Sequence, residues 1–299
     1  VSGIELILTR LHAGAKFSNK EYTFSGGLHG VGISVVNALS DRLCVDVCQH
    51  AQKWQMRFEE GLPVTPLESI GSVAKYTTGT KVRFWPTAHY FDQPEFSIQE
   101  LKQQLHAKAV LCQGLTIYLK VPCKDIHYNW CYHTGLKGYL SGLLEEQEPL
   151  LSEPFSGEIA NEGSQVEWAI NWVEFGSKSC SESYVNLIPT SGGGTHVNGF
   201  RLGVYEGIKE FCEIHNLLPR NLKLKAEDCW EGSQFVLSLK MTNPQFSGQT
   251  KERLSSRQAT ILVSSVVKDR ISLWLNQNIE NGKSLVELMI QAAQKRLKQ

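Results

Sequence analysis

A glycine-rich segment near the start of the sequence has the residue types of a phosphate-binding loop. Gly26 and Gly27 are followed by Gly30 and Gly32. Glycine allows positive φ and lets the backbone approach a ligand closely, and the helix predicted over 33–39 directs free N–H groups and a positive dipole end toward an anion. The spacing G-x-x-G-x-G is neither the dinucleotide-binding pattern nor the P-loop. A tight turn that uses the glycines only for packing is the competing interpretation.

Two side chains on the preceding loop, residues 14–25, could complete a nucleotide site. Lys16 could supply a point charge to a phosphate, and Tyr22 could stack on a base or hydrogen-bond to it. The alternatives are a solvated surface lysine and a tyrosine buried at the edge of the fold.

A second candidate is Gln249-Thr250-Lys251, in a polar loop far along the chain. A lysine that reaches a γ-phosphate from another domain would distinguish bound ATP from ADP. An ordinary charged loop is the alternative. The run from Gly192 to His196 is a weaker signal, because a loop-to-helix junction with Thr or Asn capping explains it.

No metal site is predicted. His29 and His196 have no partner at ligand spacing, and the cysteines show no zinc-like spacing. Reduced, structural cysteines in a cytosolic protein are expected.

The overall composition limits the function classes. Lys+Arg and Asp+Glu are equal at 30 each, which excludes a strongly basic nucleic-acid tail as the dominant feature. No apolar run reaches the ~18 residues of a membrane-spanning helix. The first residues lack both the features of a signal peptide and an initiator Met, so we expect a fragment.

Hydrophobic periodicity predicts the elements that must position these residues. In the first half we expect a helix that begins with the capping box Ser2–Glu5, a short helix at 33–39, a hairpin around 49–52, strands at 72–78, 80–85 and 115–121, and a helix at 97–110. In the second half we expect helices at 136–143, 198–215, 257–278 and 284–298, and strands at 166–172, 183–189 and 235–241.

These elements predict an α+β protein of two domains. The first is a sandwich of a mostly antiparallel sheet with helices on one face. Residues 122–133 are polar and show no pattern, so we place the boundary there, with domains at 1–126 and 127–299.

Longer runs of sequence carry a family resemblance. The sequence resembles the B subunits of type IIA topoisomerases over essentially the whole chain, and its C-terminal half is more similar to the topoisomerase IV branch than to gyrase B. The matching runs are 13–17, Tyr22, 25–40, 79–86, 184–189, 193–201, 244–257 and 274–278.

The resemblance implies a GHKL-type ATPase sandwich, incomplete at its N-terminus, followed by a transducer with a ribosomal-protein-S5-like fold. It implies that Lys16 approaches the phosphates, Tyr22 the adenine, and Thr80 the floor of the adenine pocket. Gln249 and Lys251 are implied as the catalytic residues that reach the γ-phosphate, which would make the interdomain angle depend on the nucleotide. The loop that wraps the phosphates would be Gly26, Gly27, Leu28, His29, Gly30, Val31, Gly32 and Ile33.

The resemblance also implies ATP and Mg²⁺ as cofactors. The general-base Glu and the Mg²⁺-binding Asn of the family are expected upstream of Val1, so this chain alone is not expected to turn over ATP. Implied partners are the topoisomerase A subunit, DNA, and a second copy of the intact protein upon ATP binding. The implied activity is strand passage for relaxation and decatenation, in the cytoplasm on the chromosome and without a membrane.

Two alternatives stay open. One is a non-catalytic fragment that binds a nucleotide or an inhibitor. The other is a different GHKL ATPase, such as a mismatch-repair clamp, against which the Gln249–Lys251 loop and the Gly-Gly-Thr-His run argue.

Overall fold

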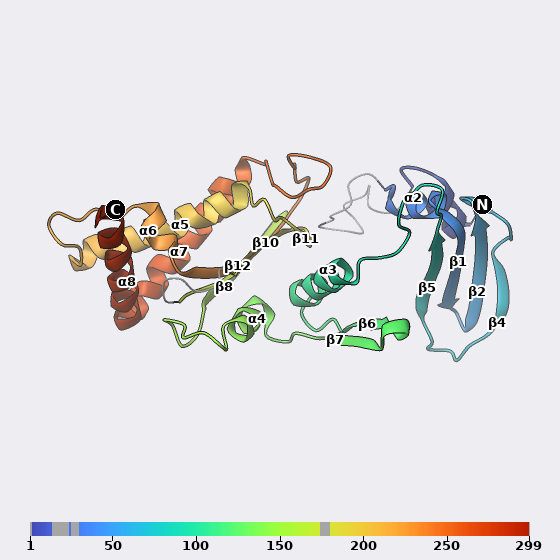
Figure 1. Cartoon of the computed structure of the whole chain (residues 1–299), viewed down its shortest axis with the longest axis horizontal. Coiled ribbons are helices and arrows are strands. Elements are labelled where there is room, and N and C mark those ends of the chain that lie inside the picture. The colour runs from blue at the N-terminus through green and yellow to red at the C-terminus, as the bar shows by residue number, and fades with distance from the viewer. Residues whose placement is uncertain (1, 14–23, 25–29, 174–179, 299) are drawn as a thin grey trace. The chain divides into compact units, whose positions relative to one another are not determined.

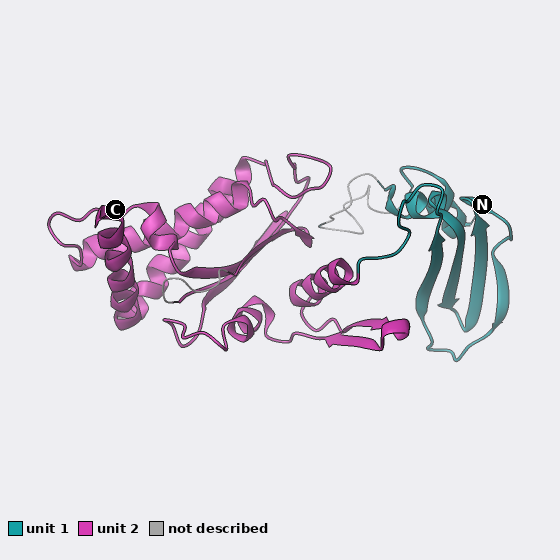
Figure 2. Ribbon diagram, in the orientation of Figure 1, with its two compact units in different colours: residues 1–97 teal, residues 98–299 magenta. Residues whose placement is uncertain are grey.

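A computed structural model describes residues 2–13, 24, 30–173 and 180–298. The chain forms two compact units, Val1–Ser97 and Ile98–Gln299 (Figure 2). Each unit has its own sheet and its own hydrophobic core.

The first unit is an antiparallel sheet in the order β3-β2-β1-β5, with β4 also paired to β2. Figure 1 labels β5, β1, β2 and β4. Two short helices pack with the sheet: α1 (Gly3–Thr9) and α2 (Gly32–Ala38). The strands are β1 (Ser40–Gln49), β2 (Gln52–Glu59), β3 (Leu62–Pro63), β4 (Glu68–Ser72) and β5 (Gly79–Pro86).

One face of this sheet is apolar, as the alternating pattern predicts. Leu43 and Val45 of β1 and Met56 and Phe58 of β2 are buried together with Leu8 of α1. His50 and Ala51 join β1 to β2, and both have the positive φ that a two-residue hairpin turn requires. The predicted hairpin is confirmed, and α1 and α2 pack on the apolar face through Leu8 and Val36. The helix predicted at 97–110 and the strand predicted at 115–121, expected in the same sandwich, belong to the second unit instead.

The strand predicted at 72–78 is wrong. β4 ends at Ser72 and pairs with β2, whereas β5 pairs with β1. Residues 73–78 instead link the two edges of the sheet. Sequence alternation identifies a strand but not its partner, and these two strands are not neighbours in the sheet.

The second unit contains a five-stranded mixed sheet in the order β11-β10-β12-β9-β8 and a separate hairpin of β6 and β7. Only β10 and β12 are parallel neighbours in the larger sheet. The strands are β6 (Ile117–Val121), β7 (Ile126–Trp130), β8 (Phe155–Asn161), β9 (Ser164–Trp172), β10 (Ser181–Val185), β11 (Ile188–Pro189) and β12 (Ser233–Met241). The helices are α3 (Ile98–Leu111), α4 (Gly135–Leu143), α5 (Thr195–His215), α6 (Ala226–Trp230), α7 (Gln258–Gln277) and α8 (Ile279–Lys298), with a 3₁₀ turn at Pro122–Lys124.

Both faces of this sheet are covered. On β9, Trp168 and Ile170 lie in the larger core with residues of α5, α7 and α8, whereas Ala169 lies in a second cluster with residues of α3 and α4. A strand buried on both faces is nearly continuously apolar. The alternation predicted from residues 166–172 therefore marks the face toward the larger core.

Helix α5 runs parallel to α7 at very close range, because three glycines face its partner. A Cβ atom at Gly199 would lie 2.5 Å from the carbonyl oxygen of Thr260, and one at Gly203 would lie 2.5 Å from that of Ser264. At Gly207 it would lie 2.3 Å from Cγ2 of Ile271. The glycines recur every fourth residue, on one face of the helix.

Several elements of the second unit have no counterpart among the elements predicted from the sequence. β8, α6 and β7 were not predicted, and β7 lies inside the polar segment that was expected to separate the domains. Residues 122–133 are polar because the hairpin of β6 and β7 exposes one face. The predicted boundary between residues 126 and 127 falls within β7 and stays a prediction.

Candidate functional site

The helix that follows the glycine segment is anchored from its C-terminal end. Asn37 of α2 is almost fully buried and donates to the carbonyl oxygens of Leu8 and Gly61, both at 3.0 Å. The hydroxyl of Ser40 donates to the carbonyl oxygen of Val36 at 2.6 Å. These bonds fix α2 on α1 and on the turn after β2, so the start of α2 has a defined place in the first unit.

The start of α2 has glycine at two positions and no side-chain cap. Gly30 has a φ of 58°, in the left-handed region that favours glycine. At Gly32 a Cβ atom would meet no atom of the described residues within 4 Å, so packing in that part of the chain does not require glycine there. The N-cap residue Val31 forms no side-chain cap. This geometry fits a phosphate group that approaches the backbone closely.

Thr80 lies at the start of β5, opposite Val47 of β1. Val45 faces Val82 in the same register, so Thr80 is on the sheet face that carries the apolar core. Its side chain is exposed. The structure thus brings Thr80 and residues 30–33 into the same unit.

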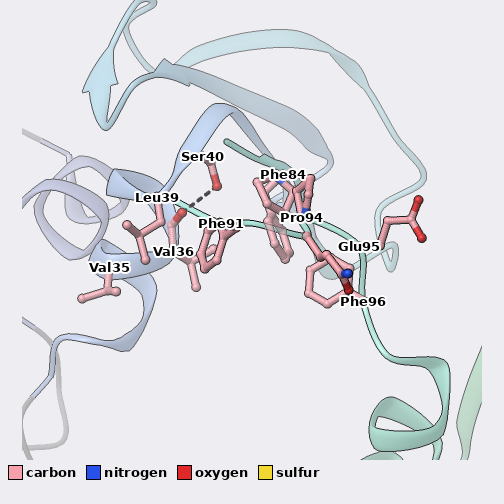
Figure 3. A pocket seen from close by; sticks show the side chains of 11 residues that line it. Val35, Val36, Leu39, Ser40, Phe84, Phe91, Pro94, Glu95 and Phe96 are labelled. Atoms are coloured by element: carbon pink, nitrogen blue, oxygen red, sulfur yellow. Dashed lines mark hydrogen bonds between the residues drawn. The ribbon is translucent and has the colours of Figure 1, made fainter. Parts of the chain in front are cut away.

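The first unit contains a cavity of about 280 Å³ that Val35 and Val36 of α2 help to line (Figure 3). Phe84 and Phe96 line it and meet edge to face, with ring centroids 5.8 Å apart. Residues of α2 and the segment 91–96 complete the wall, which contains no Lys or Arg. None of residues 30–33 or Thr80 lines this cavity. Its apolar wall does not suit a triphosphate.

Six of the predicted nucleotide-binding residues lie outside the described residues. They are Lys16, Tyr22, Gly26, Gly27, Leu28 and His29.

The loop between β12 and α7 presents the other two predicted residues. Gln249 is exposed, and Lys251 is half-buried with a φ of 57°. The amide of Lys251 donates to the carbonyl oxygen of Gly248 at 3.2 Å, which closes a tight turn at the loop tip. The turn thus carries the side-chain amide of Gln249 and the ammonium of Lys251 two residues apart in the sequence.

The segment Gly192–Thr195 differs from its predicted role. Gly194 is the N-cap residue of α5 and forms no side-chain cap, and Thr195 Oγ1 is buried without a hydrogen-bond partner. The expected Thr or Asn cap is therefore wrong. The glycines instead lie against the loop that carries Lys251, and only their clustering in the sequence hinted at such a contact.

Two further features concern the described residues as a whole. Within 2–13, 24, 30–173 and 180–298, no group of three or more His, Cys, Asp or Glu side chains could hold a metal ion. Among the helices of these same ranges, none has the length and apolar character needed to cross a bilayer.

Comparison with known sequences identifies relatives along the whole chain. A family model described as DNA gyrase B matches residues 135–299. The B subunit of DNA topoisomerase 4 from Pseudomonas aeruginosa is 54% identical over 298 residues, which cover 100% of this chain and 47% of the relative. Its counterpart from Salmonella typhimurium is 52% identical, with coverage of 100% and 47%. The chain spans about half the length of the curated relatives it matches.

Solved structures match the chain over nearly its full length. A topoisomerase IV ATP-binding domain of Francisella tularensis, in complex with a small-molecule inhibitor, has a TM-score of 0.79 and 43% identity and covers 99% of this chain and 78% of its own. The 43K ATPase domain of Thermus thermophilus gyrase B, in complex with an aminocoumarin, also has a TM-score of 0.79, at 26% identity, with coverage of 99% and 75%. The predicted α+β class with a GHKL-type ATPase is confirmed.

Proposed function

Since the chain belongs to the DNA gyrase B family, we propose that it is the ATP-operated clamp region of a topoisomerase IV B subunit. The observation that carries this proposal is the likeness to a topoisomerase IV ATP-binding domain over 99% of the chain. The identities of 54% and 52% with topoisomerase IV B subunits favour that branch.

The glycine segment would bind the phosphates of ATP. Gly26 to Ile33 form the binding loop, Lys16 approaches the phosphates, Tyr22 lies on the adenine side, and Thr80 lies on the floor of the adenine pocket. Two observations support this assignment: Gly30 has the positive φ that favours glycine, and a Cβ atom at Gly32 would meet no described atom within 4 Å.

Gln249 and Lys251 would contact the γ-phosphate. The Lys251 ammonium neutralises charge that builds up on the phosphoryl oxygens as the bond to the leaving group breaks. The tight turn at Gly248–Lys251 supports this role, since it holds a charged side chain at a defined point of an exposed loop. Mg²⁺ would bind together with ATP and neutralise part of the negative charge on its phosphates.

The whole protein would act on DNA together with a topoisomerase A subunit. ATP binding would close two copies into a clamp, and strand passage would relax and decatenate DNA in the cytoplasm, on the chromosome. The names of the relatives support this assignment. It concerns the whole protein, because this chain spans about half the length of those relatives.

Steady-state ATP hydrolysis tests the enzymatic part of the proposal. The protein used is the chain joined to the segment that precedes this region in its relatives. We expect phosphate release that saturates with ATP and requires Mg²⁺. Saturable nucleotide binding without any phosphate release would contradict the enzymatic role and favour a non-catalytic nucleotide-binding module.

A further inference from the structure

The loop that carries Lys251 is fastened to the start of α5 by its main chain. The amide of Gly192 donates to the carbonyl oxygen of Glu252 at 2.9 Å. The amide of Leu254 donates to Gly193, and the amide of Thr195 donates to Leu254, both at 3.1 Å. The stretch from Gly192 to Thr195 therefore pairs with the base of the loop in the manner of a short strand.

Gly194 is the point of closest approach in this pairing. A Cβ atom there would lie 2.3 Å from the carbonyl oxygen of Leu254 and 2.5 Å from its nitrogen. Both are main-chain atoms, which cannot rotate away as a side chain can. Gly194 also has a φ of 130° and a ψ of −160°, a region that is essentially restricted to glycine. Any other residue must push the two segments apart.

The contact at Leu254 is transmitted to the loop tip. Leu254 is buried and forms an isolated antiparallel β-bridge with Phe246, so the two sides of the loop are joined at this residue. One step further, the amide of Ser247 donates to the carbonyl oxygen of Arg253 at 2.9 Å. Only a short turn that includes Lys251 remains beyond this bond, so the position of the turn follows the position of Leu254.

The other side of the contact is rigid. Thr195 begins a 21-residue helix, and its carbonyl oxygen accepts a hydrogen bond from the hydroxyl of Thr260 in α7 at 3.0 Å. The starts of α5 and α7 are thus linked to each other as well as to the loop. A loop fastened to two packed helices has fewer accessible positions than one held only by its two ends.

We propose that Gly194 is a positioning residue for Lys251, because its lack of a side chain lets the α5 start hold the loop at Leu254. The consequence for ATP hydrolysis rests on the proposed function. The consequence for the loop itself does not, because it concerns only contacts within the second unit.

The first test measures how well the loop is held, with no nucleotide present. Trypsin cleaves after Lys251 and Arg253, and its rate follows the population in which the loop is released. In the chain as it stands, Gly194→Ala is expected to raise cleavage at these two sites about tenfold or more. Gly142→Ala is the matched control, since a Cβ atom there meets no described atom within 4 Å and the residue lies outside the loop, and its cleavage rate at these two sites should equal that of the wild type.

A milder variant covers the case in which Gly194→Ala does not fold. A Cβ atom at Gly192 would lie 3.2 Å from the carbonyl oxygen of Glu252, which demands a smaller shift of the same loop. Gly192→Ala is then expected to raise cleavage at Lys251 and Arg253 with the circular dichroism unchanged. Wild-type cleavage rates in the folded variants would overturn the proposal.

The second test measures hydrolysis by the extended protein. Displacement of Lys251 should lower kcat about 10²-fold and leave KM for ATP nearly unchanged. The double variant Gly194→Ala/Lys251→Ala should be no slower than Lys251→Ala, because both changes remove one interaction. Effects that multiply would overturn the proposal. If the extended wild type releases no phosphate, the proposed function fails, and the trypsin result alone decides whether Gly194 holds the loop.

Discussion

Replacement of Lys251 by Ala in the extended protein is expected to lower kcat for ATP hydrolysis by about 10²–10³-fold. The reason is electrostatic. A positioned ammonium acts on charge that is greatest in the transition state, so its loss slows the chemical step more than it weakens binding. KM for ATP should therefore change little. Steady-state phosphate release over a range of ATP concentrations separates the two constants.

A matched lysine provides the control for this experiment. Lys283 of α8 is half-exposed and pairs with Glu280 on the surface at 2.8 Å. Lys283→Ala removes the same charge without touching the loop, so its kcat should equal that of the wild type. Equal rates for Lys251→Ala and Lys283→Ala would remove Lys251 from the mechanism and leave the ATPase assignment intact.

Replacement of Gly203 by Ala is expected to lower the free energy of unfolding of the second unit by about 2–3 kcal/mol. The new Cβ atom would lie 2.5 Å from the carbonyl oxygen of Ser264 and 3.1 Å from the nitrogen of Lys268. Both are main-chain atoms of α7, so the two helices must separate along their length. Better helix propensity offsets the cost by at most about 1 kcal/mol. Urea unfolding followed by circular dichroism measures the change.

The same substitution elsewhere should have the opposite sign. Gly142 lies in the last turn of α4, and a Cβ atom there meets no described atom within 4 Å. Gly142→Ala is therefore expected to raise stability by up to about 1 kcal/mol through helix propensity. A Gly203→Ala protein as stable as Gly142→Ala would show that α5 and α7 do not depend on this close contact.

The sequence predicts elements well where periodicity reflects burial. Trp168 and Ile170 alternate because they face one core, and Phe200 and Val204 follow a helical stripe for the same reason. Periodicity fails for β8, where Gly157 interrupts the apolar pattern. A Cβ atom at Gly157 would lie 2.4 Å from Cζ2 of Trp168, so the missing side chain makes room for a large one on the next strand.

The candidate site shows the same limit. The spacing of Gly30 and Gly32 predicts a loop that approaches a ligand, and in the structure Gly30 has a positive φ and Gly32 has free space around it. Gly194 and Gly203 serve different purposes: Gly194 lets the loop at Leu254 approach closely, and Gly203 lets helix α7 approach closely. Those partners are distant in sequence, so local spacing cannot separate the three uses of glycine. Longer matching runs identify the family where single motifs do not.

The measurement that tests the ATP-operated clamp most directly is light scattering of the extended protein with and without a non-hydrolysable ATP analogue. The proposed clamp predicts a mass of one copy without nucleotide and of two copies with the analogue and Mg²⁺. A mass that stays at one copy when the analogue is saturating would contradict it.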